Sequence, residues 1–355
     1  MDVADDGITM DELQLAARNH GLPLEALRWA VTPVGLHYLL VHYDIPQVDD
    51  TWRLELDGEV DAPASLSLED LRALPSHEVV ATMECAGNGR ARLVPRPLSQ
   101  PWLHEAVGTG RWRGVRLRDV VAFARARPGA TEIVFTGLDH GVEGGEEQAF
   151  QRSLPLELAL GDEVLLAYEL NGAPLPPQHG YPLRLLVPGW YGMTNVKWLS
   201  RVTLADEPFT GYQQARGYRM RHAETDEGVP LQRMLPRALM VPPGIPEFMT
   251  RERAVTPGLV ALQGRAWSGH GAIETVEVSA DDGATWAAAT LEPPELGPWA
   301  WQRWTFDWRA TPGEHVLACR ARDAAGNTQP LEAAWNVGGY ANNAVQRVRV
   351  VVTSL

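Results

Sequence analysis

The alternation of apolar and polar positions predicts short strands and few helices in the first half of the chain. Residues 52–57 (Trp-Arg-Leu-Glu-Leu-Asp) alternate with a period of two, which is typical of a half-buried strand. Apolar runs bounded by Gly, Asn or Pro predict further strands at 78–83, 132–136, 164–170 and 183–187. Capping or amphipathic patterns predict helices after Thr9, after Ser67 and from Leu117. Because strands and helices do not alternate strictly, the pattern favours an α+β first domain.

The pattern changes in the second half of the chain. A stretch rich in Pro, Arg and Gly with weak periodicity predicts a connector at 216–235. Short apolar segments separated by turn residues then follow at 259–267, 275–280, 299–308, 315–322 and 347–352. Such spacing predicts an immunoglobulin-like β-sandwich. The predicted organisation is an N-terminal helical segment at 1–30, a first domain at 31–215, the connector, and the sandwich at 236–355.

Length and charge narrow the classes of function. A chain of 355 residues usually contains more than one core, which agrees with two domains. Its formal net charge of −14 argues against binding to nucleic acid or to an anionic membrane surface. Met1 to Gly7 lack the basic start of an export signal, and the apolar run at 34–41 is too short to span a bilayer. We expect a cytoplasmic protein, or a periplasmic one if a signal peptide has been removed.

Cysteine and lysine are both rare, which makes their positions informative. The two cysteines, Cys85 and Cys319, are too few for a disulfide scaffold, and we expect them in different domains. The only lysine is Lys197, where a flexible ammonium group is indicated in place of a planar guanidinium. The sequence contains no GxGxxG after a strand, no GxxxxGK[ST], no GxSxG and no HExxH. Nicotinamide chemistry, ATP chemistry and serine hydrolysis therefore have no support from motifs.

Cys85 lies in a glycine-flanked loop directly after a predicted strand. Gly87 and Gly89 permit positive φ and the close approach of a bulky group. The nearby Arg90 and Arg92 favour a thiolate, which is a nucleophile or a ligand for a soft metal. The alternative interpretation is a small buried residue in a turn.

Four separated blocks resemble the sulfite oxidase family. Residues 83–90 (Met-Glu-Cys-Ala-Gly-Asn-Gly-Arg) resemble its CAGN-x-R loop, whose cysteine binds molybdenum. Residues 167–184 and 187–199 resemble its AYE-NG-LP-HG-P-R and VPG-VKWL blocks, and 267–286 resemble part of its C-terminal dimerisation domain. The blocks occur in the family's order and extend from about residue 32 to the end. The resemblance implies a sulfite-oxidase-type molybdopterin-binding domain, followed by a domain that forms a homodimer.

The resemblance also implies a set of site residues. Cys85 corresponds to the molybdenum ligand, and Arg90 corresponds to the arginine that faces the substrate anion. The positions that correspond to molybdopterin-binding residues are His42, Asp139, His179, Arg184, Asn195, Val196 and Lys197. A phosphate-bearing cofactor needs cations and directed donors of this kind. The alternative is that Arg184 and Lys197 are charged tips of a surface strand and the histidines are ordinary, partly buried side chains.

The implied reaction is the oxidation of sulfite to sulfate by oxygen-atom transfer. Because no haem-attachment motif or flavin fingerprint is present, the electrons would pass to an external acceptor such as cytochrome c. Three positions depart from the family pattern: Leu40 and Gln302 replace arginines, and Phe150 replaces a tyrosine. These changes motivate a second hypothesis, in which the same cofactor acts on a sulfane or a sulfoxide. The side chains predicted to line such a reshaped pocket are His37, Tyr38, Tyr43, Trp190 and Tyr191.

Two hypotheses without redox chemistry also remain open from the sequence. The chain could be a structural homologue that has lost its activity. Its C-terminal half could be a carbohydrate- or ligand-binding module, because it contains six tryptophans in a short span, Trp267, Trp286, Trp299, Trp301, Trp304 and Trp308. Tryptophans in such a domain are more often core or interface residues.

Overall fold

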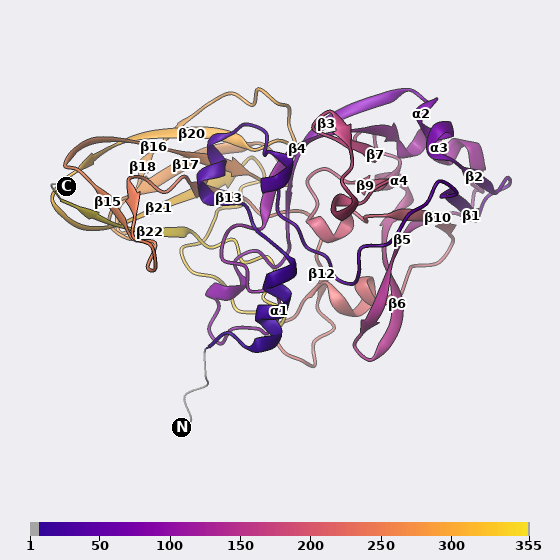
Figure 1. Ribbon diagram of the computed structural model, residues 1–355, viewed down its shortest axis with the longest axis horizontal. Helices are drawn as coiled ribbons and strands as arrows, with labels where there is room; N and C mark the ends of the chain where they lie inside the picture. The colour runs from indigo at the N-terminus through magenta and orange to yellow at the C-terminus, as the bar shows by residue number, and fades with distance from the viewer. Residues whose placement is uncertain (1–6, 354–355) are drawn as a thin grey trace.

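The computed structural model describes residues 7–353, which form two sheet-rich halves arranged along the long axis of the molecule (Figure 1). The strands that follow residue 237 lie at one end, and the sheet that contains β1 and β10 lies at the other. Helix α1, Met10–Arg18, lies between the two halves in this view. Most of the segment used to predict the absence of an export signal, residues 1–6, lies outside the described residues.

The first half contains two five-stranded sheets. The outer sheet has the order β2-β1-β10-β5-β6, and β1 pairs with β10 in parallel. Its strands are Ala64–Leu66 (β2), Leu54–Gly58 (β1), Leu199–Ala205 (β10), Glu132–Glu143 (β5) and Glu146–Pro155 (β6). The second sheet has the order β3-β4-β7-β8, and β9 pairs with β7. Its strands are Ser76–Glu84 (β3), Val107–Arg116 (β4), Leu165–Leu170 (β7), Ala173–Pro174 (β8) and Arg184–Leu186 (β9).

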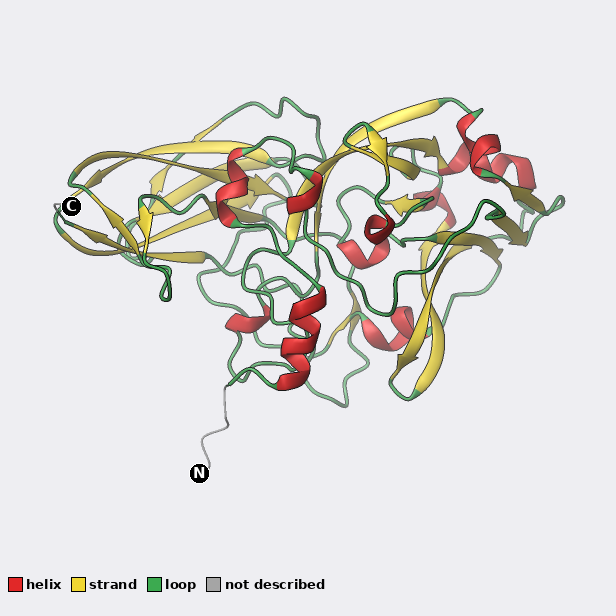
Figure 2. Ribbon diagram, in the orientation of Figure 1, coloured by secondary structure: helices red, strands yellow, loops and turns green. Residues whose placement is uncertain are grey.

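Helices are short and few within the described residues, as Figure 2 shows. Capping boxes begin two of them: Thr9 and Glu12 cap α1, and Ser67 and Asp70 cap α2, Leu68–Arg72. Each cap satisfies backbone N–H groups that lack an intrahelical partner and contributes about 1 kcal/mol. The other α-helices are Leu117–Ala124 (α3) and Leu156–Ala159 (α4). Single-turn segments are Leu24–Arg28 (η1), Val34–Leu36 (η2), Arg90–Arg92 (η3), Pro177–His179 (η4), Gly192–Thr194 (η5) and the π-helical Gln213–Gly217 (η6).

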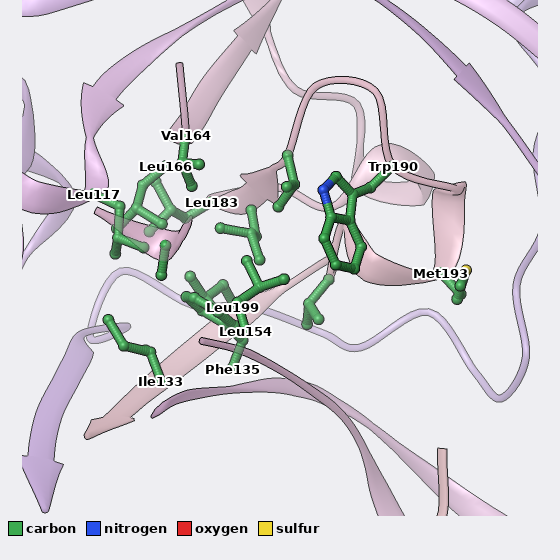
Figure 3. Close-up of a cluster of buried hydrophobic side chains, with 14 of the residues drawn as sticks. Leu117, Ile133, Phe135, Leu154, Val164, Leu166, Leu183, Trp190, Met193 and Leu199 are labelled. Carbon is green, nitrogen blue, oxygen red and sulfur yellow. The ribbon is translucent and has the colours of Figure 1, made fainter. Parts of the chain in front are cut away.

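A hydrophobic core joins the two sheets of the first half (Figure 3). Leu166 of β7 and Leu183 face the outer sheet, which contributes Phe135, Leu154 and Leu199. All five side chains are fully buried. Burial of one such side chain contributes about 1.5–3 kcal/mol, so this core fixes the position of β7 and of its neighbour β9, which carries Arg184.

The second half is a pair of packed sheets. One has the order β13-β16-β20-β19, with strands Arg237–Met240, Gly258–Trp267, Gln302–Ala310 and Thr290–Leu291. The other has the order β14-β15-β22-β21-β17-β18, with strands Ile245–Pro246, Arg253–Val255, Gln346–Val352, Gly313–Asp323, Ile273–Ser279 and Ala287–Ala288. Buried residues of both sheets share one core. The predicted sandwich is therefore present, and its immunoglobulin type stays a prediction.

The six C-terminal tryptophans are packed in the protein. Four of them, Trp267, Trp301, Trp304 and Trp308, are at most 5 % exposed. They therefore do not form an exposed platform of the kind that a carbohydrate-binding module would need. The two cysteines are free thiols in different hydrophobic clusters, as expected from the sequence.

The segment predicted as a connector is folded back onto both halves. Two short strands within it, Arg219–Met220 (β11) and Val229–Pro230 (β12), pair with each other. Trp190 forms a β-bridge with Arg233, and Tyr218 stacks against Tyr340 near the C-terminus. The segment therefore contributes side chains to the interior, which a simple linker would not do. No helix within residues 7–353 has the length and apolar character needed to cross a membrane.

Candidate functional site

Cys85 is the first residue of the loop that follows β3, Ser76–Glu84. The Cys85 N–H donates to the Ala106 carbonyl at 2.9 Å, and the Cys85 carbonyl accepts from the Asn88 N–H at 3.0 Å. Gly89 has φ of 93°, a conformation that favours glycine. A Cβ at position 87 would lie 2.7 Å from the Arg90 guanidinium carbon. Gly89 thus serves for its positive-φ backbone conformation, and Gly87 serves because the Arg90 guanidinium group packs closely against it.

The protonation of Cys85 differs from the sequence-based prediction. Burial raises the pKa of its thiol, and this effect exceeds the opposing influence of the nearby Arg90 charge. Arg90 thus favours the thiolate as predicted, but burial outweighs its influence in the protein alone, because the side chain is only 6 % exposed. A metal ion bound to the sulfur would reverse this balance, since coordination deprotonates a thiol.

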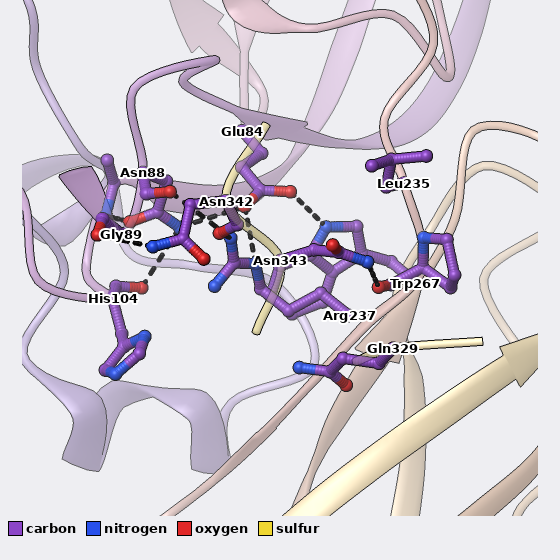
Figure 4. Close-up of polar contacts among 12 residues, drawn as sticks. Glu84, Asn88, Gly89, His104, Leu235, Arg237, Trp267, Gln329, Asn342 and Asn343 are labelled. Carbon is purple, nitrogen blue, oxygen red and sulfur yellow. Dashed lines mark hydrogen bonds and ion pairs between the residues drawn. The ribbon is translucent and has the colours of Figure 1, made fainter. Parts of the chain in front are cut away.

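A buried ion pair holds the Cys85 loop to the second half of the protein (Figure 4). The Arg237 Nε of β13 lies 2.7 Å from Glu84 Oε1, and both side chains are 2 % exposed. Glu84 also accepts from Trp267 Nε1 at 2.9 Å and from Asn88 Nδ2 at 3.0 Å. Sequence reasoning missed this contact, although a glutamate and an arginine inside otherwise apolar strands are the signal that could have suggested it.

The thiol lines a cavity that is here called the inner cavity. Six of the predicted cofactor residues line it together with Cys85: His42, Asp139, His179, Arg184, Asn195 and Lys197. The seventh, Val196, has its side chain in the hydrophobic core, and its carbonyl accepts from the Leu185 N–H at 2.8 Å. The structure therefore brings together residues that are more than 150 positions apart in the sequence.

Of the two cations of the inner cavity, Arg184 is buried and Lys197 is half-buried, and neither forms an ion pair with a carboxylate of the described residues. Arg184 donates to the carbonyls of His179 and Asn195, each at 3.0 Å, while its Nε has no protein partner. Lys197 Nζ donates to the Leu40 carbonyl at 2.8 Å and to the Gln178 carbonyl at 3.3 Å. Burial lowers the pKa of Arg184 to about 10 and also lowers the pKa of Lys197. Neither residue is a charged tip on the surface, so that alternative is wrong.

The histidines of the inner cavity are neutral at pH 7. Burial lowers the pKa of His37 to about 4, that of His42 to about 3 and that of His179 to about 2, with nearby positive charges acting in the same direction. His37 Nε2 has no hydrogen-bond partner. Burial also raises the pKa of Asp139, whose Oδ1 lacks a partner as well.

These groups fit an anionic, hydrogen-bonding cofactor. Buried polar atoms are normally paired, so the unpartnered atoms of His37, Asp139 and Arg184 indicate a ligand that completes them. An anion such as a phosphate would also relieve the desolvation of Arg184 and Lys197. Among the described residues, no group of three or more His, Cys, Asp or Glu could hold a metal ion. A metal on Cys85 would therefore need further ligands from the cofactor itself.

A second cavity, here called the outer cavity, meets the inner one at Cys85. The two share Leu40, His42, Cys85 and Tyr218 as lining residues. The other lining side chains of the outer cavity include Arg90, Tyr43, Tyr340 and Glu143. Two carbonyls, those of Gly338 and Gln100, accept from the Arg90 guanidinium at 2.8 and 3.1 Å, and the group lies 5.1 Å from the Tyr340 ring centroid.

The three positions that depart from the family pattern are not all at the site. Leu40 and Phe150 line the inner cavity, but Gln302 lies on β20 and donates to the Glu292 carbonyl. Gln302 lines a separate cavity beside Trp267, so the prediction that it belongs to the substrate pocket is not supported by its position.

Of the five side chains predicted to line a reshaped pocket, the structure brings three to the site. His37 and Tyr38 line the inner cavity, and Tyr43 lines the outer one. Trp190 and Tyr191 belong to the hydrophobic core.

Comparison with known proteins gives two family matches. The model described as an oxidoreductase molybdopterin binding domain matches residues 42–213. The model described as a Mo-co oxidoreductase dimerisation domain matches residues 237–353. Together they cover both sheet-rich halves of the structure.

Whole-chain relatives agree with these matches. Sulfite oxidase of Gallus gallus is 36 % identical over 336 residues, which cover 89 % of this chain and 72 % of that protein. Mitochondrial sulfite oxidase of Rattus norvegicus is 38 % identical over 341 residues, 91 % of this chain. The chain spans 62 % of the length of that mammalian relative. The NAD(P)H nitrate reductase of Hordeum vulgare is 32 % identical over 91 % of this chain and 39 % of its own length.

A solved structure shares the complete fold. The sulfane dehydrogenase SoxCD from Paracoccus pantotrophus superimposes with a TM-score of 0.79 and 25 % identity. The match covers 100 % of this chain and 95 % of the compared chain. The two family matches agree with the structure, in which the Cys85 loop lines a cavity suited to an anionic cofactor. The chain belongs to the sulfite oxidase family of molybdopterin-dependent oxidoreductases.

Proposed function

We propose that this protein oxidises a sulfur compound by oxygen-atom transfer at molybdenum, with sulfite as the first substrate to test, and passes the electrons to an external acceptor such as cytochrome c. The observation that carries the proposal is the position of Cys85. Its sulfur lines a cavity in which buried cations and unpartnered polar atoms match a phosphate-bearing pterin. When bound, the cofactor supplies the oxygen-atom transfer and the two-electron redox chemistry.

The residues of the chain would ligate the metal, bind the pterin and attract the substrate. Cys85 would ligate the metal, while Arg184, Lys197 and the neutral His42 and His179 would bind and orient the pterin. The side-chain amide of Asn195 would shape the cavity wall and not bind the pterin with its oxygen, because this Oδ1 already accepts from the Val187 N–H at 2.7 Å. Arg90 would attract an anionic substrate to the outer face of Cys85.

A second candidate function is the oxidation of a sulfane or the conversion of a sulfoxide at the same centre. Two observations favour it over sulfite. Leu40 and Phe150 place apolar side chains in the inner cavity where the family pattern has an arginine and a tyrosine, and Glu143 places a carboxylate in the outer cavity. The SoxCD structure, described as a sulfane dehydrogenase, matches the whole chain.

Expression in a host that makes molybdopterin tests the proposal. We expect about one molybdenum per chain by elemental analysis, and steady-state oxidation of sulfite with cytochrome c or ferricyanide as acceptor. Cys85→Ser should reduce turnover by more than the 10–100-fold typical of losing a supporting contact at a metal site. Full turnover by Cys85→Ser would contradict the proposal. A molybdenum-loaded protein that turns over sulfoxides or sulfanes but not sulfite would instead support the second candidate.

We also propose that the protein is a homodimer formed through its second half. The support is the dimerisation-domain match over residues 237–353. Exposed apolar residues at the turn between β14 and β15, Phe248 at 81 % and Met249 at 79 %, would lose this exposure in an interface. Sedimentation equilibrium of the full chain distinguishes a dimer from a monomer directly.

A further inference from the structure

His37 presents a ring nitrogen without a partner to the inner cavity. Its side chain lines that cavity and is 2 % exposed, and its Nε2 has no hydrogen-bond partner among the described residues. The residue precedes position 42, at which the match to the molybdopterin-binding family model begins. The sequence predicted it as part of a substrate pocket and not among the cofactor residues. His37 is therefore a buried polar group of the site whose partner has still to be identified.

The ring of His37 is held in one orientation by its neighbours. It stacks on the Tyr38 ring with 5.4 Å between centroids, and it meets the rings of Trp112 and His179 edge-on at 5.9 and 5.5 Å. Gly108 of β4 gives the ring its room, because a Cβ at that position would lie 2.6 Å from His37 Cδ2. A ring confined on these sides is preorganised, so a hydrogen bond to its free nitrogen costs little conformational entropy.

The other ring nitrogen decides which role Nε2 can have. Nδ1 of His37 lies 3.1 Å from the Tyr38 carbonyl oxygen, which can only accept, so Nδ1 carries a proton. Burial lowers the pKa of His37 to about 4, and the Arg184 charge acts in the same direction, so the ring is neutral at neutral pH. A neutral imidazole carries a single proton, which leaves Nε2 with a lone pair. The missing partner of His37 is therefore a hydrogen-bond donor.

The inner cavity combines this acceptor with cations, which narrows the class of its ligand. Arg184 and Lys197 line the same cavity and suit an anion such as a phosphate. A fully ionised phosphate offers acceptor oxygens only, so it cannot donate to His37. Asp139 Oδ1 is a second buried acceptor of this cavity without a partner. A ligand that satisfies both kinds of group carries an anion and N–H donors, and a phosphate-bearing pterin does so through its ring N–H and amino groups.

We infer that His37 is a cofactor-contacting residue, whose Nε2 accepts a hydrogen bond from an N–H group of the pterin. Together with the cations that bind the phosphate, this contact distinguishes the two ends of the cofactor, because one end offers donors and the other offers negative charge. The inference rests on the proposed function, since it takes the ligand of the inner cavity to be a molybdopterin.

The test compares His37→Asn with His37→Gln in the full chain, expressed in a host that makes molybdopterin. Asparagine places its amide near the position of Nδ1, so it can keep the bond to the Tyr38 carbonyl while it lacks the acceptor at Nε2. Glutamine reaches the position of Nε2, where its amide oxygen can accept. His104→Asn is the matched control, because His104 is also a buried histidine with an unpartnered ring nitrogen but lines neither the inner nor the outer cavity.

The measured quantity is the first-order rate at which molybdenum and pterin leave each protein at one fixed temperature. We expect His37→Asn to lose its cofactor roughly 10–100-fold faster than the original protein, because a buried donor of the pterin is left without an acceptor. His37→Gln should recover most of this loss, and His104→Asn should release its cofactor at close to the original rate. Equal release rates from His37→Asn and the original protein would overturn the inference, and so would an equal acceleration in His104→Asn.

A measurement on the original protein needs no variant to fold. Nuclear magnetic resonance of histidine labelled with a nitrogen isotope gives the tautomer of the His37 ring. We expect the proton on Nδ1 with and without cofactor, and a change in the Nε2 resonance when the cofactor binds; a proton on Nε2 in either state overturns the inference. If the original protein retains molybdopterin but oxidises no sulfur compound, the proposed function fails while the release rates still decide the role of His37. An original protein that binds no pterin refutes both.

Discussion

The inner and outer cavities share the Cys85 thiol as a lining group but offer different chemistry. The inner cavity presents the buried Arg184 and the half-buried Lys197 beside histidines held neutral by burial. The outer cavity presents one guanidinium group, one carboxylate and phenols. The inner cavity therefore holds two cations and one carboxylate, that of Asp139, whereas the outer cavity holds one cation and one carboxylate. We interpret this difference as a division of roles, in which the inner cavity retains a cofactor tightly and the outer cavity exchanges a substrate.

The buried ion pair that holds the Cys85 loop to the second half offers the largest expected effect. Arg237→Leu leaves Glu84 buried without its cation, and breaking such a pair typically costs 3–5 kcal/mol of unfolding free energy. Arg303→Leu is the matched control, because Arg303 pairs with Glu292 at the same 2.7 Å but both side chains are at least a third exposed. The control should cost less than about 1 kcal/mol. Urea unfolding measures both values, and equal losses would show that the Cys85 loop is not anchored from the second half.

Lys197→Met tests whether the inner cavity retains the cofactor. The substitution keeps the apolar stem but removes the charge that faces the cavity, and we expect a 10–100-fold loss of cofactor affinity. Molybdenum content after extended dialysis measures it. The matched variant Arg90→Gln removes a cation from the outer cavity and should retain its molybdenum while its KM for sulfite rises. The division of roles would be refuted if both variants lost molybdenum equally.

The buried histidines predict how acid affects the cofactor-free protein. The pKa of His37 is about 4 in the folded state and 6.5 in its ordinary state, so the unfolded chain binds more protons between these values. Folded stability therefore falls as the pH drops through this window, by about 2 kcal/mol for this one group between pH 7 and pH 5. His37→Asn should lose about 2 kcal/mol less on the same acidification, as measured by urea unfolding at both pH values. A variant that loses as much as the original protein would show that His37 is not buried as a neutral ring.

Glu143→Gln gives the smallest expected effect and addresses the outer cavity. The carboxylate accepts from Gln213 Nε2 at 2.6 Å and from Tyr43 Oη at 3.1 Å, bonds that glutamine can partly keep. Removal of one like charge should lower KM for sulfite by about two- to fivefold and leave KM for a neutral sulfoxide unchanged. Glu147→Gln, on an exposed position of the neighbouring strand β6, is the control. An unchanged KM for sulfite would mean that Glu143 does not face the substrate.

Much of the fold was accessible from local patterns. The capping boxes at Thr9 and Ser67 and the alternation near residue 54 depend on contacts within a few residues, so they were predicted near their observed positions. The helix predicted after Thr9 runs from Met10 to Arg18. Strand β4 was missed, because Gly108, Gly110 and Gly114 weaken its apolar pattern where other groups approach closely.

The sequence by itself, through its resemblance to the sulfite oxidase family, predicted which residues would bind a molybdenum cofactor, because the motif around Cys85 and the other family blocks are read from local order along the chain. Only the tertiary structure decided the protonation of Cys85, the partner of Glu84 and the place of Tyr218 at the cavity junction. These properties depend on burial and on contacts between residues more than 100 positions apart. No local sequence pattern encodes these properties. Tertiary packing decides how far a charged group is removed from water and which distant side chain becomes its partner in place of water.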